Sequence, residues 1–172
     1  MMLPIMSTSV SSDIKELPNG VIYSGSSDDT VKALDAETGE DIWEFDGHSG
    51  GVQSVAPSPD GEIVYSGSSD DTVKALDAET GDEIWESTAH SHGLESVAPS
   101  PDGEIVYSGS RDDTVKTLDA ETGEEIWEST AHSATVQSIA TSPIPTSTEI
   151  MYNEETLKTN KLEGTDDGTI TL

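Results

Sequence analysis

A block of sequence that recurs every 42 residues constrains this chain more than any other feature. The stretch 58–88, SPDGEIVYSGSSDDTVKALDAETGDEIWEST, returns at 100–130 with three substitutions, and a copy shortened at its front occupies 21–44. One Tyr and one Trp keep their place in each copy: Tyr23, Tyr65 and Tyr107, and Trp43, Trp85 and Trp127. A repeat of this length implies one small structural unit used several times, with the hydrophobic core formed between neighbouring units.

The middle copy predicts four short strands joined by tight turns. Residues 52–56 and 63–68 are rich in β-branched and aromatic side chains. The SPDG sequence at 58–61 between them has the residues that a type I turn favours at each position. Alternating patterns at 72–77 and 83–87 are separated by a DAETG turn, whose glycine is expected to need a positive φ. Because no window of the repeat shows the apolar spacing of an amphipathic helix, we expect strands throughout.

These patterns predict an all-β fold, a β-propeller of four-stranded antiparallel blades. A period of roughly 40–45 residues, with turn residues every 8–12, is typical of propeller blades. The 172 residues accommodate about 3.5–4 blades, at the low end of the roughly four to eight that closed propellers use. We divide the chain into an irregular N-terminal segment at 1–20, regular repeats at 21–143, and a degenerate, truncated last blade at 144–172.

The last repeat raises the question of how the ring closes. The sequence stops where the third strand of a fourth blade would stop, so an open arc would expose apolar blade faces and a strand edge. One hypothesis is that two chains pair such edges in a homodimer and form a closed ring of about eight blades. The alternative is that the chain is a truncated remnant of a longer propeller.

Acidic residues outnumber basic residues by 35 to 7, which gives a formal net charge of −28. This excess argues against nucleic acids as partners, because their phosphates are bound through Lys and Arg, and against an anionic membrane surface. The acids are spread through every repeat instead of being gathered in one tail, which favours adaptation to high salt over a dedicated cation-binding or basic-partner surface. Self-repulsion destabilises a compact state in dilute buffer, whereas molar salt shortens the screening length to roughly 3 Å. We therefore predict a halophilic origin.

The chain contains no cysteine, so disulfides, thiol chemistry and Cys-based zinc sites are excluded. Residues 1–6 are too short for a signal peptide and lack its basic flank, and no apolar run is long enough to span a membrane. We expect a soluble, cytoplasmic protein.

The repeat resembles the WD-repeat family in a Gly-His pair, an SPDG turn, an SGSxDxT stretch and a closing Asp. The resemblance implies a buried hydrogen-bond network in each blade, formed by His48, Ser68 and Asp70 and again by His90, Ser110 and Asp112. The sequence departs from the family at the Trp before the closing Asp, which is replaced by Leu34, Leu76 and Leu118.

The repeat also resembles pyrroloquinoline-quinone (PQQ)-type propeller repeats. Their tryptophan-docking pattern, Ala-x-Asp-x-x-x-Gly-x-x-x-Trp, begins at Ala33 and Ala75, and Thr117 replaces its Ala in the third copy. The resemblance implies that Trp43, Trp85 and Trp127 pack onto the neighbouring blade. It also implies an alternative function, a fragment or relative of a PQQ-dependent quinoprotein dehydrogenase. Such enzymes hold the cofactor at the axis of a larger ring with added metal ligands, which this sequence lacks, so we expect no bound cofactor.

The other candidates for chemistry recur with the blades. His48, His90 and His132 keep the 42-residue spacing, which favours structural hydrogen bonds over catalysis, whereas His92 is an extra histidine near a loop. Paired acids could bind Ca²⁺, but no loop has ligands at alternating positions and a terminal Glu, so we predict solvated turns and no metal site. These pairs are Asp28-Asp29, Asp70-Asp71, Asp112-Asp113 and Asp166-Asp167.

No catalytic Ser-His-Asp set can be separated from the repeat, so we predict that the protein is not an enzyme. A non-catalytic scaffold that binds an unidentified protein partner is the function that the sequence favours, since propeller loops commonly carry recognition. Arg111 interrupts an otherwise acidic rim and is the candidate for a specific partner contact.

Overall fold

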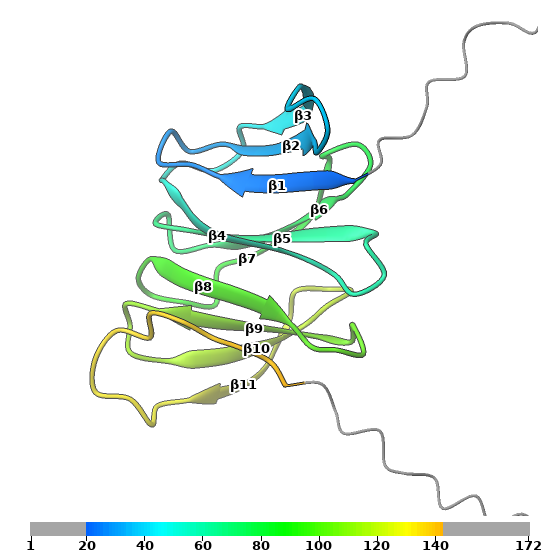
Figure 1. The fold of residues 1–172 in the computed structure, drawn as a ribbon. Helices are drawn as coiled ribbons and strands as arrows, with labels where there is room; N and C mark the ends of the chain where they lie inside the picture. The colour runs from blue at the N-terminus through cyan, green and yellow to red at the C-terminus, as the bar shows by residue number, and fades with distance from the viewer. Residues whose placement is uncertain (1–19, 143–172) are drawn as a thin grey trace, which may run out of the picture. The chain divides into compact units, whose positions relative to one another are not determined.

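Eleven strands in three antiparallel sheets make up residues 20–142, the part of the chain that the computed structural model describes. The sheets lie one after another in chain order (Figure 1). The first sheet contains β1 (Val21–Gly25), β2 (Val31–Asp35) and β3 (Asp41–Phe45). Residues 20–141 belong to one compact unit of the chain.

The second and third sheets each have four strands in sequential order, as the repeat predicts. The second contains β4 (Val52–Pro57), β5 (Ile63–Ser68), β6 (Val73–Asp77) and β7 (Glu83–Ser87). The third contains β8 (Leu94–Pro99), β9 (Ile105–Ser110), β10 (Val115–Asp119) and β11 (Glu125–Ser129). The predicted four-stranded blade is therefore confirmed in two copies. In the first copy, the segment that would supply the innermost strand lies outside the described residues.

The turns use the residues that their backbone angles require. The Gly61 N–H donates to the Ser58 carbonyl across 3.0 Å, which closes the predicted four-residue SPDG turn. Asp71, between β5 and β6, has a φ of 73°, and Asp is one of the few residues besides Gly that tolerate this left-handed region. Gly81, in the DAETG turn, has a φ of 78°, so its predicted positive φ is confirmed.

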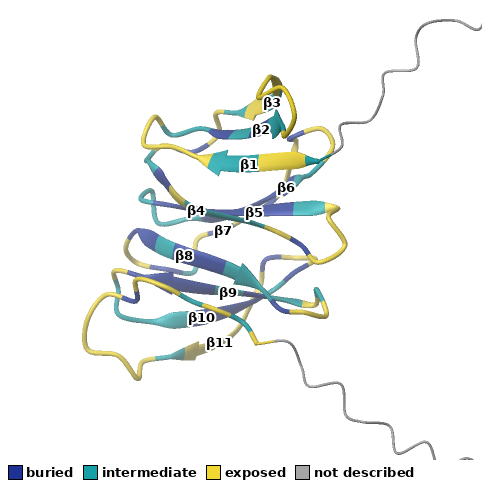
Figure 2. Cartoon of the chain, viewed as in Figure 1, coloured by how far each residue is buried: buried dark blue, intermediate teal, exposed yellow. Residues whose placement is uncertain are grey.

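The hydrophobic core lies between sheets instead of within one. Figure 2 shows buried residues along the strands of the second and third sheets. Tyr65, Val73 and Trp85 of the second sheet pack in one cluster with Leu94 and Val106 of the third. A smaller cluster joins the first and second sheets: Val31, Val52 and Leu76, with Trp43, Phe45 and Val55 against it. Each sheet thus presents one apolar face to its successor and another to its predecessor, as expected for an array of repeats.

The segment after β11 starts the contacts of another repeat without forming a strand in the described residues. The Val136 N–H donates to the Ser110 carbonyl across 2.9 Å, as the Val52 N–H does to the Ser26 carbonyl two blade boundaries earlier. The predicted domain boundaries at 20–21 and 143–144 lie at the limits of the described part. The irregular segment and the degenerate last blade lie outside it.

Candidate functional site

One tryptophan joins the first sheet to the second, and another joins the second sheet to the third by the same contacts. Trp43 Nε1–H donates to the Ala78 carbonyl across 3.1 Å, and a Cβ added to Gly81 would come within 2.8 Å of the Trp43 ring. One repeat later, Trp85 Nε1–H donates to the Ala120 carbonyl across 3.0 Å and its ring covers Gly123. We call this pair of features, an Ala carbonyl and a Gly under the indole, the tryptophan dock.

The dock is built by the turn that carries it. Asp77 Oδ1 accepts the backbone N–H groups of Thr80 and Glu79 at 2.8 and 2.9 Å, and these hydrogen bonds lower the pKa of the Asp77 carboxyl. The tightened turn brings the Ala78 carbonyl and Gly81 to one side. Because Gly81 has no side chain and a positive φ, the indole of the preceding sheet can lie directly against the backbone.

The third predicted tryptophan behaves differently. Trp127 is 45% exposed, whereas Trp85 is 8% exposed. The expectation that the tryptophans pack onto a neighbouring blade is therefore met by Trp43 and Trp85, while no dock for Trp127 lies within the described residues.

Two histidines hold buried networks at the opposite ends of the same strands. His48 Nδ1 lies 2.9 Å from Asp70 Oδ2, and His48 Nε2 lies 2.8 Å from Ser66 Oγ. Since the carboxylate only accepts, Nδ1 carries the ring proton and Nε2 accepts the serine hydroxyl. His90 makes the same contacts in the third sheet, with Asp112 at 2.9 Å and Ser108 at 2.7 Å.

Ser66 and Ser108 hydrogen-bond directly to the histidines. Ser68 and Ser110 are instead linked to the networks through the backbone N–H groups of Asp70 and Asp112. Ser68 Oγ donates to the Gly50 carbonyl at 2.6 Å and accepts the Asp70 N–H at 3.1 Å. Ser66 and Ser68 are two positions apart and share one face of β5, so strand alternation does not separate them; only their position along the strand does. His132 is exposed, and the positions that the period assigns to its partners, 150 and 154, lie outside the described residues.

Hydrogen bonding keeps the network carboxylates ionised. Burial alone would raise the pKa of Asp70, but hydrogen bonds from Thr72, the Ser49 N–H and His48 outweigh it and lower the pKa to about 2. The pKa of Asp112 is lowered in the same way by Thr114, His90 and Ser91. Burial lowers the pKa of His90, although Asp112 acts against this shift. The His90 network therefore combines an ionised carboxylate with an imidazole whose neutral form is favoured by burial.

The serine, histidine and aspartate have the connectivity of a hydrolytic triad but not its accessibility. A catalytic serine must present its oxygen to a substrate carbonyl. Ser66 and Ser108 are both fully buried, and the His48 side chain is likewise enclosed. The arrangement can fix the β3–β4 segment to β5 and the β5–β6 turn, and the β7–β8 segment to β9 and the β9–β10 turn, but it offers no surface on which a substrate could bind.

The family model described as outer membrane protein assembly factor BamB, a PQQ-like repeat family, matches residues 27–166. The chain belongs to this PQQ-like repeat family. A comparison with curated proteins finds no match. Membership agrees with the tryptophan docks, so this resemblance and the propeller fold are confirmed, whereas the resemblance to WD repeats is supported by the histidine networks and stays a prediction.

The described residues of this PQQ-like repeat chain do not fit pyrroloquinoline quinone. The quinone carries three carboxylates, which call for cationic partners, and the three lysines of residues 20–142 are each bound by two acidic side chains. Lys74 lies 2.7 Å from Glu83 and also binds Glu86, while Lys116 lies 2.8 and 2.6 Å from Glu125 and Glu128. Lys32 is held by Asp41 and Glu44 at 2.8 and 2.6 Å. The Trp43 and Trp85 indoles are in turn occupied by their docks.

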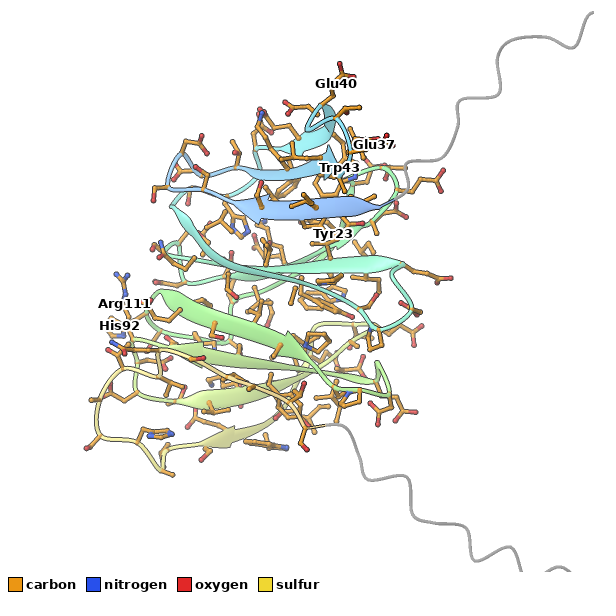
Figure 3. The ribbon with its side chains drawn as sticks, in the orientation of Figure 1. Tyr23, Glu37, Glu40, Trp43, His92 and Arg111 are labelled. Atoms are coloured by element: carbon orange, nitrogen blue, oxygen red, sulfur yellow. The ribbon has the colours of Figure 1, made fainter. Side chains whose placement is uncertain are left out.

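Arg111 has a partner within its own sheet. Its Nε donates to Glu95, and the Arg111 side chain is half exposed beside the exposed His92 on the loops at one end of the third sheet (Figure 3). The equivalent positions one repeat earlier are Gln53 and Ser69, which hydrogen-bond at 3.1 Å. Between the second and third repeats, the Gln53–Ser69 hydrogen bond is therefore replaced by an ion pair between Glu95 and Arg111. The predicted role of Arg111 in partner binding stays a prediction.

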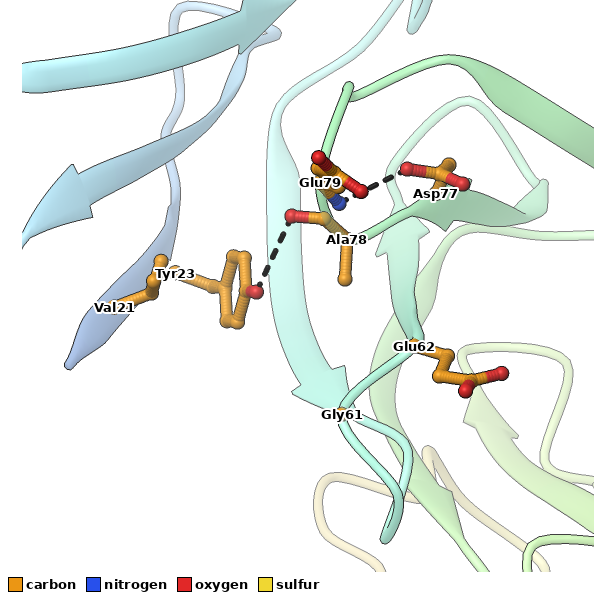
Figure 4. A pocket seen from close by; sticks show the side chains of 7 residues that line it. All are labelled: Val21, Tyr23, Gly61, Glu62, Asp77, Ala78 and Glu79. Atoms are coloured by element: carbon orange, nitrogen blue, oxygen red, sulfur yellow. Dashed lines mark hydrogen bonds between the residues drawn. The ribbon is translucent and has the colours of Figure 1, made fainter. Parts of the chain in front are cut away.

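A pocket of about 450 Å³ lies where the first sheet meets the second (Figure 4). It is lined by Val21, Tyr23, Gly61, Glu62, Asp77, Ala78 and Glu79. The Tyr23 hydroxyl donates to the Ala78 carbonyl at 3.4 Å, and burial together with Asp77 raises the pKa of this phenol. At the next boundary, Pro59 packs 3.6 Å from where a Cβ on Gly103 would lie, and Tyr65 is fully buried. The pocket therefore lies at the boundary between the first and second sheets, which is less well covered than the boundary between the second and third. Its lining residues show no catalytic or ligand-binding group.

The paired acids serve the turns in which they lie. Asp28 Oδ1 accepts the Thr30 hydroxyl at 2.7 Å, and hydrogen bonds from Thr30 and Ser26 lower the pKa of the Asp28 carboxyl. Asp70 belongs to the histidine network, and Asp71 supplies the left-handed turn. Within residues 20–142, no three potential metal ligands come together. Asp166-Asp167 lies outside the described residues.

Proposed function

We propose that the protein is a non-catalytic, protein-binding scaffold that works at high salt. The observation that carries this proposal is the complete enclosure of the repeated polar groups. Ser66, Ser108 and the two network histidines are buried and bound to one another, so their geometry serves folding. What remains for recognition is the loop and turn surface, which propellers commonly use to bind partners.

The charge of the surface supports the high-salt part of the proposal. The turns carry exposed acids in every sheet, such as Glu37, Glu79 and Glu121, and the net charge is −28. Each described lysine is already neutralised by two acids of its own sheet. A charge of this size is compatible with a compact fold when abundant counter-ions screen it.

The partner test uses the purified full chain as bait in molar KCl. We expect a discrete protein to bind it reproducibly and, after purification, to bind it again with a measurable dissociation constant. Replacing Arg111 by Ser, the residue of the second repeat, is expected to weaken this affinity if Arg111 contacts the partner. Failure of every captured protein to rebind the purified chain would refute the scaffold function.

The second candidate is a quinoprotein fragment, which the family's PQQ-type repeats favour. It requires saturable quenching of tryptophan fluorescence by pyrroloquinoline quinone in the presence of Ca²⁺. The scaffold proposal expects only the weak, unsaturable quenching of a collisional quencher. Saturation at micromolar quinone would replace the scaffold by the quinoprotein function.

We further propose that the protein acts in the cytoplasm. Residues 20–142 contain no helix long and apolar enough to cross a membrane. The family description names a factor that assembles outer membrane proteins, which would instead place a related role at the cell envelope. Fractionation of cells that express the tagged full chain separates these two locations.

A further inference from the structure

The two ends of the sheet array are complementary to one another. At both internal boundaries, the earlier sheet contributes a tryptophan and the later sheet contributes a tryptophan dock. The first sheet has a dock of its own, at Ala36 and Gly39, and the third sheet has a tryptophan, Trp127. Within the described residues, no indole lies on the dock of the first sheet and no dock receives the Trp127 indole.

The dock of the first sheet has the geometry of the occupied docks but is open. Gly39 has a φ of 72°, the same as Gly123, yet no heavy atom of residues 20–142 lies within 4 Å of where its Cβ would be. Gly81 and Gly123 are buried under their indoles, whereas Gly39 is exposed, and Ala36 is exposed where Ala120 is buried. Asp35 braces this turn by accepting the Glu37 and Thr38 N–H groups at 2.9 and 2.8 Å, as Asp77 does one repeat later.

The apolar surface beside the open dock is uncovered as well. Ile22 is 50% exposed, while its equivalents Val64 and Val106 are fully buried against the preceding sheet. Leu34 is half-buried, whereas the equivalent Leu76 is fully buried. The outward side of the first sheet is therefore a receiving face, made of Ile22, Leu34, Ala36 and Gly39, that lacks its covering sheet in the described residues.

The outward side of the third sheet is the matching donor face, made of Tyr107, Val115 and Trp127. Tyr65 and Val73, which occupy these positions in the second sheet, are 1% and 2% exposed, while Tyr107 and Val115 are half-buried. Val136 and Ile139 approach this sheet at Gly109, where they would lie 2.7 and 3.2 Å from an added Cβ, whereas Trp127 stays 45% exposed. The third sheet thus has the side chains of a donor face, but no dock for the Trp127 indole lies within residues 20–142.

We propose that a second copy of this chain fills both vacancies, with Trp127 of each copy docked on Ala36 and Gly39 of the other. This contact is the same as the two that the chain already makes within itself, Trp43 on Gly81 and Trp85 on Gly123. Because the repeats are nearly identical, we expect the donor face and the receiving face to be complementary in shape. Two such contacts related by a two-fold axis close a ring, and three described sheets from each copy give six, within the roughly four to eight blades of closed propellers. This assembly joins sheet faces, so it does not depend on strand edges or on the scaffold function.

Charge does not oppose the docking once salt is present. Glu37 and Glu40 flank the open dock at the outer end of the first sheet (Figure 3). Glu79 and Asp82 flank the dock that Trp43 occupies, and Glu121 and Glu124 flank the dock of Trp85. Two acidic residues therefore flank each of the occupied docks, and they do not prevent an indole from binding there. The remaining repulsion between two chains of charge −28 is screened over about 3 Å at molar salt.

The test is the molar mass of the full chain in 2 M KCl, measured by light scattering. We expect twice the 18.1 kDa of one chain for the wild type. Trp127→Ser removes the indole, and Gly39→Asn places a side chain in the dock with a residue that tolerates positive φ. Both variants are expected to be monomers with unchanged circular dichroism. Gly61→Asn is the matched control, because Gly61 has a φ of 78° and equally open space but lies outside the two faces; it is expected to remain a dimer.

A mixture of the two variants separates docking from a general defect. The Trp127→Ser chain keeps an intact dock and the Gly39→Asn chain keeps its indole, so one native contact forms between them and dimers are expected to reappear. A wild type that stays monomeric at high concentration, because the chain covers its own faces, would overturn the proposal. So would variants that remain dimeric, or a mixture that stays monomeric.

Discussion

The ring of Trp85 occupies the space in which a side chain on Gly123 would lie, so that a Cβ at Gly123 would be 2.5 Å from Trp85 Cε3. The two residues belong to different sheets and are 38 positions apart, and the Trp85 N–H at the same time binds the Ala120 carbonyl. One aromatic side chain therefore fixes both the distance and the lateral register of two sheets. This contact explains why the Ala-x-Asp-x-x-x-Gly-x-x-x-Trp spacing recurs as one unit: the Gly receives the previous tryptophan and the Trp reaches the next glycine.

Replacing Gly123 by Ala tests how much the dock stabilises the fold. The added methyl group collides with the indole and forces an Ala into positive φ, and we expect the free energy of unfolding to fall by about 3 kcal/mol. Gly61→Ala imposes the same backbone strain in open space and is expected to cost only about 1 kcal/mol. Urea unfolding at constant KCl measures both. Equal losses in the two variants would show that the indole contributes nothing beyond backbone strain.

Thr117 offers a substitution that should stabilise the protein. Its hydroxyl is buried without a hydrogen-bond partner in the described residues, at a position where the two earlier sheets have Ala33 and Ala75. Thr117→Val keeps the shape and removes the unsatisfied group, so we expect a gain of about 1 kcal/mol in unfolding free energy. The reciprocal change Val73→Thr, which buries a new hydroxyl in the cluster of the second sheet, is expected to destabilise. A loss of stability in Thr117→Val would mean that the hydroxyl has a partner.

The repeat predicted most of the fold and part of the site. Strand positions followed from alternation and turn residues, which are local, and the tryptophan contact followed from the family's docking pattern. The choice of Ser68 over Ser66 was less successful, because a motif gives spacing along the chain but not which of two serines on one strand meets His48. The exposure of Trp127 also required the structure, since the sequence repeats the donor but cannot show where the receiving sheet is.

Asp70 should make stability depend on acid pH. Its folded-state pKa of about 2 lies below the ordinary value of 3.8, so its ionised form favours the folded state. This stabilisation is present above about pH 4 and is lost as the pH falls towards 2. Asp70→Asn should cost about 2 kcal/mol at neutral pH, by removing a charged hydrogen-bond acceptor, and the difference from wild type should shrink below pH 4. Urea titrations in 2 M KCl from pH 7 to 2 measure this difference, since screening suppresses the changing repulsion among the other acids. A difference that stays constant with pH would contradict the assignment of Asp70 as an ionised partner of His48.

The net charge of −28 predicts that salt stabilises the fold. Repulsion among exposed carboxylates opposes compaction in dilute buffer and is screened as KCl rises, so the urea midpoint should increase between 0.1 and about 2 M KCl. Urea is the required denaturant because guanidinium chloride is itself a salt. Glu62→Gln combined with Glu104→Gln removes two exposed charges at equivalent turns, and should raise the midpoint at low salt while leaving it unchanged at high salt. Sucrose, which strengthens burial without screening charge, should not reproduce this convergence of the two proteins. If the charge-reduced variant gains equally at all salt concentrations, the stabilising effect of salt does not act through these carboxylates and the proposed high-salt adaptation loses its physical basis.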